Sequence, residues 1–211
     1  MRTLILSALL LAAAILPASA STVLFSSTGP GRTAVDAALN PLPDGDLFLI
    51  GTFSNVGALT LSAGSAANVL ASGGWSQFDG TRTISTIFGN PGKLTDQAQD
   101  NTVSANAFNL QNAYIVIFNS PSAATATEMG VFRATAGTPA WVFPTNAGGI
   151  GDSVTLDMND TTIAAVNSVG STTASPQRFV LTALVPEPSA IGLALSGVLG
   201  LVGYRRLRRL C

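Results

Sequence analysis

The sequence predicts a mainly β fold: a single β-sandwich or jelly-roll-like domain with one short helix, framed by two apolar terminal helices. Short runs rich in β-branched and aromatic residues recur between turn signals across residues 21–184, which is typical of sheets joined by tight turns. The 211-residue chain is also 47% apolar and only 10% charged. The usual charged share is about 25%, so a charge-rich disordered chain and a coiled coil are excluded.

Charge divides the chain into three parts. Residues 21–184 carry five basic and ten acidic side chains, a net charge of −5, whereas the two ends hold the other five arginines. This balance excludes a basic nucleic-acid binder, so we expect no nucleic-acid partner. The chain has no His, and its single Cys is Cys211. Mechanisms that need an imidazole, internal disulfides and Cys-based zinc sites are therefore excluded.

The first 20 residues have the three parts of a secretory signal peptide. Arg2 supplies a positive start, residues 4–16 form an apolar helical run, and Pro17 ends it. An A-x-A cleavage site follows, with the small side chains of Ala18 and Ala20 that suit signal peptidase. We therefore expect an N-terminal signal helix that is cleaved after Ala20; an uncleaved anchor is the alternative.

The body, residues 21–184, contains nine runs with β character. Residues 114–118 are apolar on both faces and predict a central, buried strand. Apolar Leu156 and Met158 alternate with Asp157, which predicts a strand exposed to water on one face. The runs are 23–25, 47–53, 83–88, 113–118, 130–135, 140–143, 153–158, 161–169 and 178–185.

Turn signals and one helical segment separate these runs. The turn signals lie at residues 43–45, 73–74, 90–92, 119–121 and 148–151, each containing Gly or Pro. Residues 59–71 are rich in Ala, with apolar residues at roughly helical spacing and a Gly pair just beyond. They predict the one short helix of the body.

The body shows no catalytic motif. It contains no phosphate-binding glycine loop and no GxSxG, and without His a Ser triad of the usual kind cannot form. A Ser–Lys dyad would need Lys93, the only lysine, whose neighbours predict a solvated loop. Paired carboxylates would allow glycoside hydrolysis, but Glu128, the only glutamate of the body, is interpreted as a surface residue. We predict that the protein is not an enzyme and uses no cofactor.

Four oxygen-bearing side chains cluster within nine residues: Asp152, Asp157, Asn159 and Asp160. Hard oxygen ligands of this kind suit Ca²⁺, but the spacing matches no EF-hand loop. A turn between two strands is the other interpretation, and the one that we favour. We therefore predict no metal site.

Four aromatic residues of the body, Trp75, Phe78, Trp141 and Phe143, are candidates for a sugar-stacking platform. Packing in the hydrophobic core is the alternative. With only two Trp and two Tyr in the chain, we favour core packing.

The C-terminal end predicts a transmembrane helix. Residues 189–204 contain no charge, and the span 189–207 would measure roughly 28 Å at ~1.5 Å per residue, close to a hydrocarbon core of ~30 Å. By the positive-inside rule the arginines that follow stay cytoplasmic, so the body lies on the far side of the membrane. A buried core helix is the alternative. The membrane-boundary arginines are Arg205, Arg206, Arg208 and Arg209.

A proline-flanked glutamate stands in front of this helix, in Val185-Pro186-Glu187-Pro188-Ser189. The two prolines hold the backbone extended and remove hydrogen-bond donors, which suits docking of a processing enzyme. This motif, then an apolar span, then an arginine cluster, in a chain with a signal peptide, resembles the PEP-CTERM sorting signal. A proline-rich juxtamembrane linker is the alternative.

The resemblance covers residues 185–209 and implies a bacterial protein that is exported, held by its C-terminal helix and recognised by an exosortase. Pro186, Glu187 and Pro188 would be the recognition residues. The family is associated with extracellular polysaccharide and biofilm. The body resembles, on LFLIGTF, AYIVIF and GVFRAT, uncharacterised bacterial PEP-CTERM proteins of similar length, and that likeness implies no activity.

We therefore expect a signal peptide (1–20), an exported β domain (21–184) and a sorting signal (185–209) made of the motif 185–189, the helix 189–204 and the arginine cluster 205–209. The expected function is that of an exosortase-processed cell-surface or matrix protein associated with exopolysaccharide. One alternative is a carbohydrate- or calcium-binding adhesive module. Another is a secreted carboxylate-dependent hydrolase.

Overall fold

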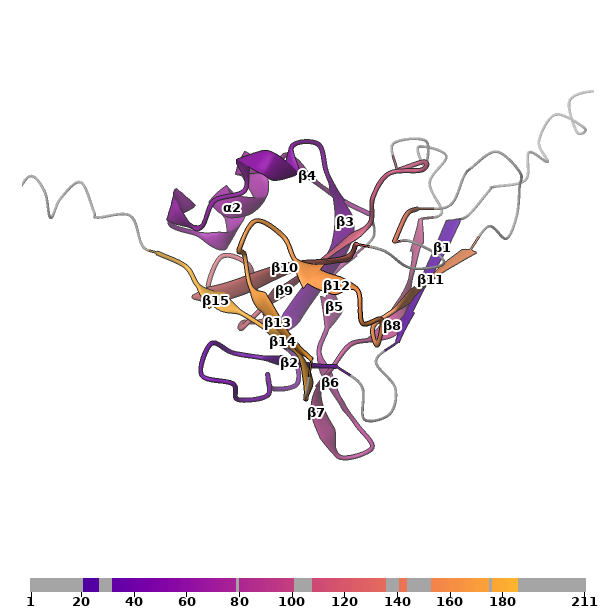
Figure 1. Cartoon of the computed structure of the whole chain (residues 1–211), viewed down its shortest axis with the longest axis vertical. Coiled ribbons are helices and arrows are strands. Elements are labelled where there is room, and N and C mark those ends of the chain that lie inside the picture. Colours follow the sequence, from indigo (N-terminus) through magenta and orange to yellow (C-terminus); the bar gives the residue numbers. More distant parts are fainter. Residues whose placement is uncertain are drawn as a thin grey trace, which may run out of the picture.

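The structure is a computed structural model that describes residues 21–26, 32–78, 80–100, 108–135, 141–143, 153–174 and 176–185. Within these residues the chain is mainly β, as the sequence predicts, with a single α-helix. Figure 1 shows the helix on one side of the strands and a hairpin projecting from the lower end.

The largest sheet contains seven strands. Its path is β12 (Ile163–Ala165), β10 (Glu128–Ala134), β9 (Tyr114–Phe118), β3 (Leu47–Phe53) and β4 (Trp75–Gln77). β15 (Thr182–Ala183) pairs with β10, and β5 (Arg82–Thr83) pairs with β3. The predicted strands 47–53 and 114–118 are confirmed, and they lie side by side at the centre of the sheet.

Both faces of this sheet are buried, because alternate side chains of each central strand enter different hydrophobic cores. Every residue of β3 and β9 is buried, which confirms the prediction of a central strand apolar on both faces. One core, which we call the strand-side core, contains Phe48, Ile117 and Phe132. The core on the other face of the sheet, which we call the helix-side core, contains Leu49 and Val131.

The helical segment covers the helix-side core. Two short 3₁₀ turns, Val56–Ala58 and Leu61–Ala63, precede α2 (Ala66–Ser72). The predicted helix at 59–71 therefore holds only for its second half. Gly64 in the left-handed conformation ends the second 3₁₀ turn, and the Ser65 hydroxyl then caps α2 by accepting from the Asn68 amide at 3.3 Å.

Two three-stranded sheets contribute to the strand-side core. One has the order β11 (Ser153–Asp157), β1 (Ser21–Ser26), β8 (Thr95–Asp100), and the other β13 (Ser171–Ala174), β14 (Gln177–Val180), β2 (Thr33–Val35). In each sheet an early strand pairs in parallel with a late one, β1 with β11 and β2 with β14. Strands from opposite ends of the body are thereby joined.

The hairpin β6 (Ser85–Ile87) and β7 (Asn90–Lys93) corrects one predicted turn. We expected the turn at residues 90–92, but the chain reverses at Phe88 and Gly89, which have φ of 50° and 75° and follow the pairing of Ile87 with Asn90. The register shifts between that pair and Ser85–Lys93, so β7 carries an extra residue at a bulge. A bulge tolerates proline because its amide is not needed in the ladder.

Several predicted strands are shorter than expected. The run 83–88 divides into β5 and β6, the run 161–169 keeps only β12, and the run 178–185 divides into β14 and β15. Within 141–143 only Val142 pairs, in an isolated bridge with Asn112. Five strands were not predicted, namely β2, β4, β7, β8 and β13, because they are short or rich in polar residues and carry no apolar run.

Candidate functional site

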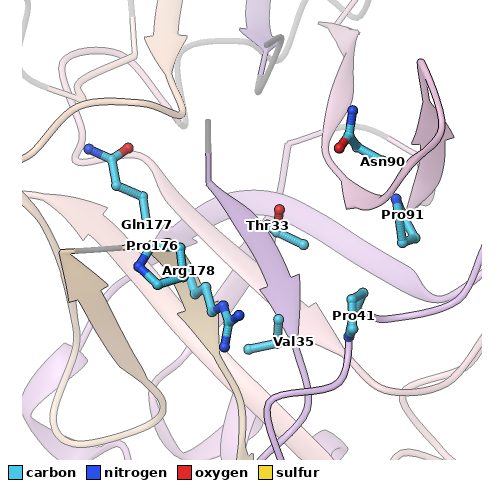
Figure 2. Close-up of a pocket in the computed structure, with 8 residues that line it drawn as sticks. All are labelled: Thr33, Val35, Pro41, Asn90, Pro91, Pro176, Gln177 and Arg178. Carbon is cyan, nitrogen blue, oxygen red and sulfur yellow. The ribbon is translucent and has the colours of Figure 1, made fainter. Parts of the chain in front are cut away.

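A pocket of about 200 Å³ lies between β2, β7 and β14 (Figure 2). Its walls come from three segments that are far apart in the sequence, so no local motif marked it. The lining residues are Thr33, Val35, Pro41, Asn90, Pro91, Pro176, Gln177 and Arg178.

The register of β2 and β14 decides which side chains face this pocket. Arg178 pairs with Thr33, and Phe179 pairs with Ala34. Phe179 and Ala34 have no exposed surface and belong to the strand-side core. Because side chains alternate along a strand, Thr33 and Arg178 lie together on the opposite face, which is the pocket side.

Asn90 and Pro91 form a second wall of the pocket, and the close approach of Gly92 to β2 places them there. A Cβ on Gly92 would stand 2.5 Å from the Ala34 carbonyl oxygen and 2.7 Å from the Thr33 methyl group, and its φ is +76°. Only glycine accepts both this backbone conformation and this approach. The bulge in β7 therefore turns Asn90 and Pro91 toward the pocket.

The turn after β2 supplies the third wall. Asp36 accepts hydrogen bonds from the Asn40 amide at 2.8 Å and from its side chain at 3.0 Å, and these bonds lower the pKa of Asp36. Pro41 then returns to pair with Val35. Glu128 fixes the turn from outside, because its Oε2 accepts from the Ala37 amide at 2.8 Å. The predicted surface role of Glu128 is thus more specific than solubility.

The pocket presents neutral polar groups and one cation. Arg178 is half-buried, and among the described residues no hydrogen bond or ion pair engages its guanidinium group. The Asn90 side chain donates to the Phe88 carbonyl oxygen at 3.2 Å, which orients its amide. Thr33 adds a hydroxyl and Gln177 a second amide, and no lining residue is a carboxylate.

Two further cations are buried beside the pocket, Arg32 directly before β2 and Lys93 at the end of β7. Arg32 and Lys93 are each only 2% exposed, and Lys93 Nζ donates to the Arg32 carbonyl oxygen at 3.4 Å. The solvated loop predicted around Lys93 is therefore wrong: β7 packs on β2 and encloses the side chain. Desolvation lowers the pKa of Lys93 and, against the attraction of Asp160, the pKa of Arg32.

Among the described residues, a backbone carbonyl oxygen and an aromatic ring contact the Arg32 guanidinium group. Its Nη2 donates to the Asp160 carbonyl oxygen at 2.9 Å, and its guanidinium carbon lies 5.5 Å from the centre of the Phe179 ring. Nε and Nη1 find no partner in the part of the chain that the structure describes. The guanidinium charge is therefore not neutralised by a hydrogen-bonded carboxylate in that part.

The predicted oxygen cluster forms a turn. Asp157 Oδ1 accepts from the Asn159 amide at 2.8 Å, and Asp160 Oδ1 accepts from the Thr162 amide at 2.7 Å. These bonds connect β11 to β12 and confirm the interpretation as a turn between strands. Asp152 lies outside the described residues, and within those residues no three acidic, His or Cys side chains are grouped to hold a metal.

Three of the four candidate aromatic residues pack in the core, and the fourth, Trp75, packs against it. Phe78, Trp141 and Phe143 are at most 5% exposed, with the Phe78 and Phe143 rings 4.7 Å apart. Trp75 is half-buried against Phe53, with ring centres 4.7 Å apart. Core packing is confirmed, and these rings do not form a surface platform.

Asp46 is a buried carboxyl that the sequence did not single out. It is 4% exposed, and its Oδ2 has no partner among the described residues. Burial raises the pKa of Asp46. It does not line the pocket, so this carboxyl and the pocket are separate features.

The predicted processing residues lie outside the described part of the chain. They are Ala18, Ala20, Pro186, Glu187, Pro188, Arg205, Arg206, Arg208 and Arg209. The predicted helix 189–204 lies outside it as well. Across the described ranges, no helix is both long and apolar enough to span a membrane.

Comparison with known proteins gave no match: no protein-family model, curated protein or solved structure is similar to this chain.

Proposed function

We propose that this chain is an exported cell-surface or matrix protein that is cleaved by signal peptidase, anchored transiently by its C-terminal helix and processed by an exosortase. One observation carries the proposal. A Pro-Glu-Pro motif, an uncharged span and an arginine cluster follow one another at residues 185–209, in a chain whose first 20 residues have the pattern of a signal peptide. Each part is common alone, and their order is specific.

The ends of the body are compatible with cleavage at both sites. β1 runs from Ser21, so cleavage after Ala20 leaves the whole strand in the mature protein. β15 ends at Ala183, Leu184 is buried, and Val185 is 58% exposed. The chain therefore reaches solvent directly before Pro186, where an exosortase would need access to it.

The proposed role of the body is association with exopolysaccharide without catalysis, on a β-sandwich-like arrangement of packed sheets. The pocket offers hydroxyl, amide and guanidinium groups, which bind polar ligands. Its lining includes no carboxylate or imidazole to act as a general acid or base. A carbohydrate-binding adhesive module is the second candidate, and the same pocket favours it.

Mass spectrometry of the protein from cells with an active exosortase tests the processing. We expect the native product to lack residues 1–20 and the apolar C-terminal segment. The double variant Pro186→Ala/Pro188→Ala should retain that segment, whereas Pro121→Ala, at an exposed proline of the body, should be processed normally. A native product that still contains residues 190–209 would contradict the proposal.

Fractionation of the same cultures tests the polysaccharide association. The mature protein should be recovered with the extracellular polysaccharide and should move to the soluble fraction in a strain that makes no polysaccharide. An unchanged distribution between the two strains would contradict this part of the proposal and leave the processing step unaffected.

A further inference from the structure

Arg178 carries a guanidinium group that no other described residue engages, on a backbone position that the strand pairing fixes. Its backbone is held in the β14–β2 ladder opposite Thr33, and none of the described residues forms a hydrogen bond or ion pair with its guanidinium group. Guanidinium groups present a planar fork of N–H donors that matches a carboxylate in two parallel hydrogen bonds. Such a fork in a pocket suits a carboxylate ligand.

The groups around Arg178 suit hydroxyls next to that carboxylate. Figure 2 shows Gln177 and Arg178 on one side of the pocket and Asn90 on the other, with Thr33 between them. The Thr33 hydroxyl and the two amides both donate and accept hydrogen bonds. The rest of the lining includes Pro41, Pro91 and Pro176. Their fixed φ makes this part of the wall rigid, and without an amide hydrogen they donate no backbone hydrogen bond to a ligand.

The charge around the pocket attracts an anion. Arg178, Arg32 and Lys93 are three of the five basic residues of 21–184, and all three lie on or beside β2, β7 and β14. The lining itself contains no carboxylate. A guanidinium group in a lining without a carboxylate gives the pocket a local positive potential, although the body as a whole has a net charge of −5.

The size of the pocket limits the ligand. Pockets for drug-sized molecules measure about 300–1,000 Å³, whereas this one measures about 200 Å³. A single sugar ring or a small hydroxy acid is the appropriate size. A longer chain would enter only with one terminal unit.

We propose that the pocket between β2, β7 and β14 binds the carboxylate of a small polyhydroxylated ligand, with Arg178 holding the carboxylate and Thr33, Asn90 and Gln177 contacting the hydroxyls. Two kinds of ligand carry a carboxylate next to several hydroxyls: an acidic sugar unit and an open-chain sugar acid. Only the choice of the acidic sugar as the natural source rests on the proposed association with polysaccharide.

Isothermal titration calorimetry of the full chain in detergent micelles tests the proposal with four probes: glucuronate, gluconate, glucose and acetate. We expect glucuronate to bind with about millimolar affinity, at least tenfold more tightly than glucose or acetate. Gluconate as the tighter of the two sugar acids would identify the open-chain source instead. Equal binding of glucuronate and glucose, or no heat from glucuronate at tens of millimolar, would overturn the proposal.

Substitutions at Arg178 test the residue. Arg178→Gln should weaken glucuronate binding at least tenfold, and Arg178→Lys, which keeps the charge but loses the fork, should recover only part of it. Arg133→Gln makes the same change at an arginine of β10 that contacts Tyr114 and does not line the pocket, so its affinity should equal that of the wild type. Circular dichroism establishes that each variant is folded.

Unchanged affinity in folded Arg178→Gln would overturn the assignment of the site. The processing and fractionation experiments do not depend on this result. A protein that is processed and recovered with polysaccharide but does not bind glucuronate would refute this inference alone.

Discussion

Gly92 of β7 lies directly against Ala34 of β2, so close that a β-carbon on Gly92 would stand 2.5 Å from the Ala34 carbonyl oxygen. This contact positions the β6–β7 hairpin on the β13–β14–β2 sheet. It also closes the pocket, because Asn90 and Pro91 precede Gly92 and form the wall opposite Arg178.

Gly92→Ala should destabilise the protein by about 2 kcal/mol or more and weaken ligand binding in the pocket. A left-handed conformation costs a residue with a β-carbon about 1–2 kcal/mol, and the contact with Ala34 adds to this cost. Gly89→Ala is the matched control, because Gly89 has φ +75° and a β-carbon added to it would meet no atom within 4 Å. Chemical denaturation measures both. Equal losses in the two variants would show that the close contact contributes nothing.

Phe88→Asn should stabilise the protein by about 1 kcal/mol. Phe88 is 91% exposed at the tip of the hairpin and has φ 50°, so its side chain buries little while its backbone is strained. Asn before Gly is the preferred pair in a two-residue hairpin turn of this kind. Phe88→Ala, which removes the ring without favouring the turn, should be close to neutral. A lower melting temperature for Phe88→Asn would contradict this prediction.

Asp46→Asn should stabilise the protein at neutral pH, by about 1 kcal/mol, and the gain should shrink as the pH falls. Burial raises the folded-state pKa of Asp46 above that of the unfolded chain, so folding favours the protonated form. The stabilising contribution of this proton is complete below the unfolded pKa and is lost as pH rises through the raised folded pKa.

Unfolding free energies measured from pH 3 to pH 8 test this dependence. Asp44→Asn makes the same change at an exposed carboxyl two residues away and serves as the control for the loss of a buried carboxyl. A gain from Asp46→Asn that is constant across this range would contradict the role of burial.

Asn119→Ala should destabilise the connection between β9 and β10 by about 1–3 kcal/mol. Asn119 Oδ1 accepts from the amides of Thr127 and Glu128 at 3.0 and 2.9 Å, and its Nδ2 donates to the Thr127 hydroxyl at 2.8 Å. Asn119→Asp keeps both acceptor bonds and should lose less. Hydrogen exchange of the Glu128 amide provides a local readout, and unchanged protection in Asn119→Ala would contradict the prediction.

The central residues of the long strands were predictable because their apolar pattern is a property of consecutive residues. All residues of β3 and β9 are buried, and all are apolar except Thr52 of β3, so a largely apolar run identified both strands. Gly73 and Gly74 likewise marked the end of α2. The turn at 88–89 was missed because Phe occupies a conformation that Gly or Asn normally takes, and the Pro-Gly pair next to it gave a stronger but misleading turn signal.

The pocket could not be predicted from the sequence, since its shape and the burial of the nearby cations depend on contacts between residues that are far apart in the chain. Thr33 and Arg178 become neighbours only through a parallel pairing across the body. The burial of Lys93 and Arg32 depends on how β7 packs on β2. The sequence neighbours of Lys93 predicted solvent exposure because a Pro-Gly pair usually marks a turn or loop, whereas here it lies in the bulged strand β7.

The sequence by itself determined the mainly β class and the central strands, and it predicts the targeting segments, because apolar periodicity, run length and terminal charge are properties of consecutive residues. Only the tertiary structure decided that Trp141 and Phe143 are core residues, that Asp157 and Asp160 form a turn, and that Arg178 faces a pocket. Those outcomes depend on which strands pair and in which register, and a shift of one residue would exchange the buried and exposed faces of β14.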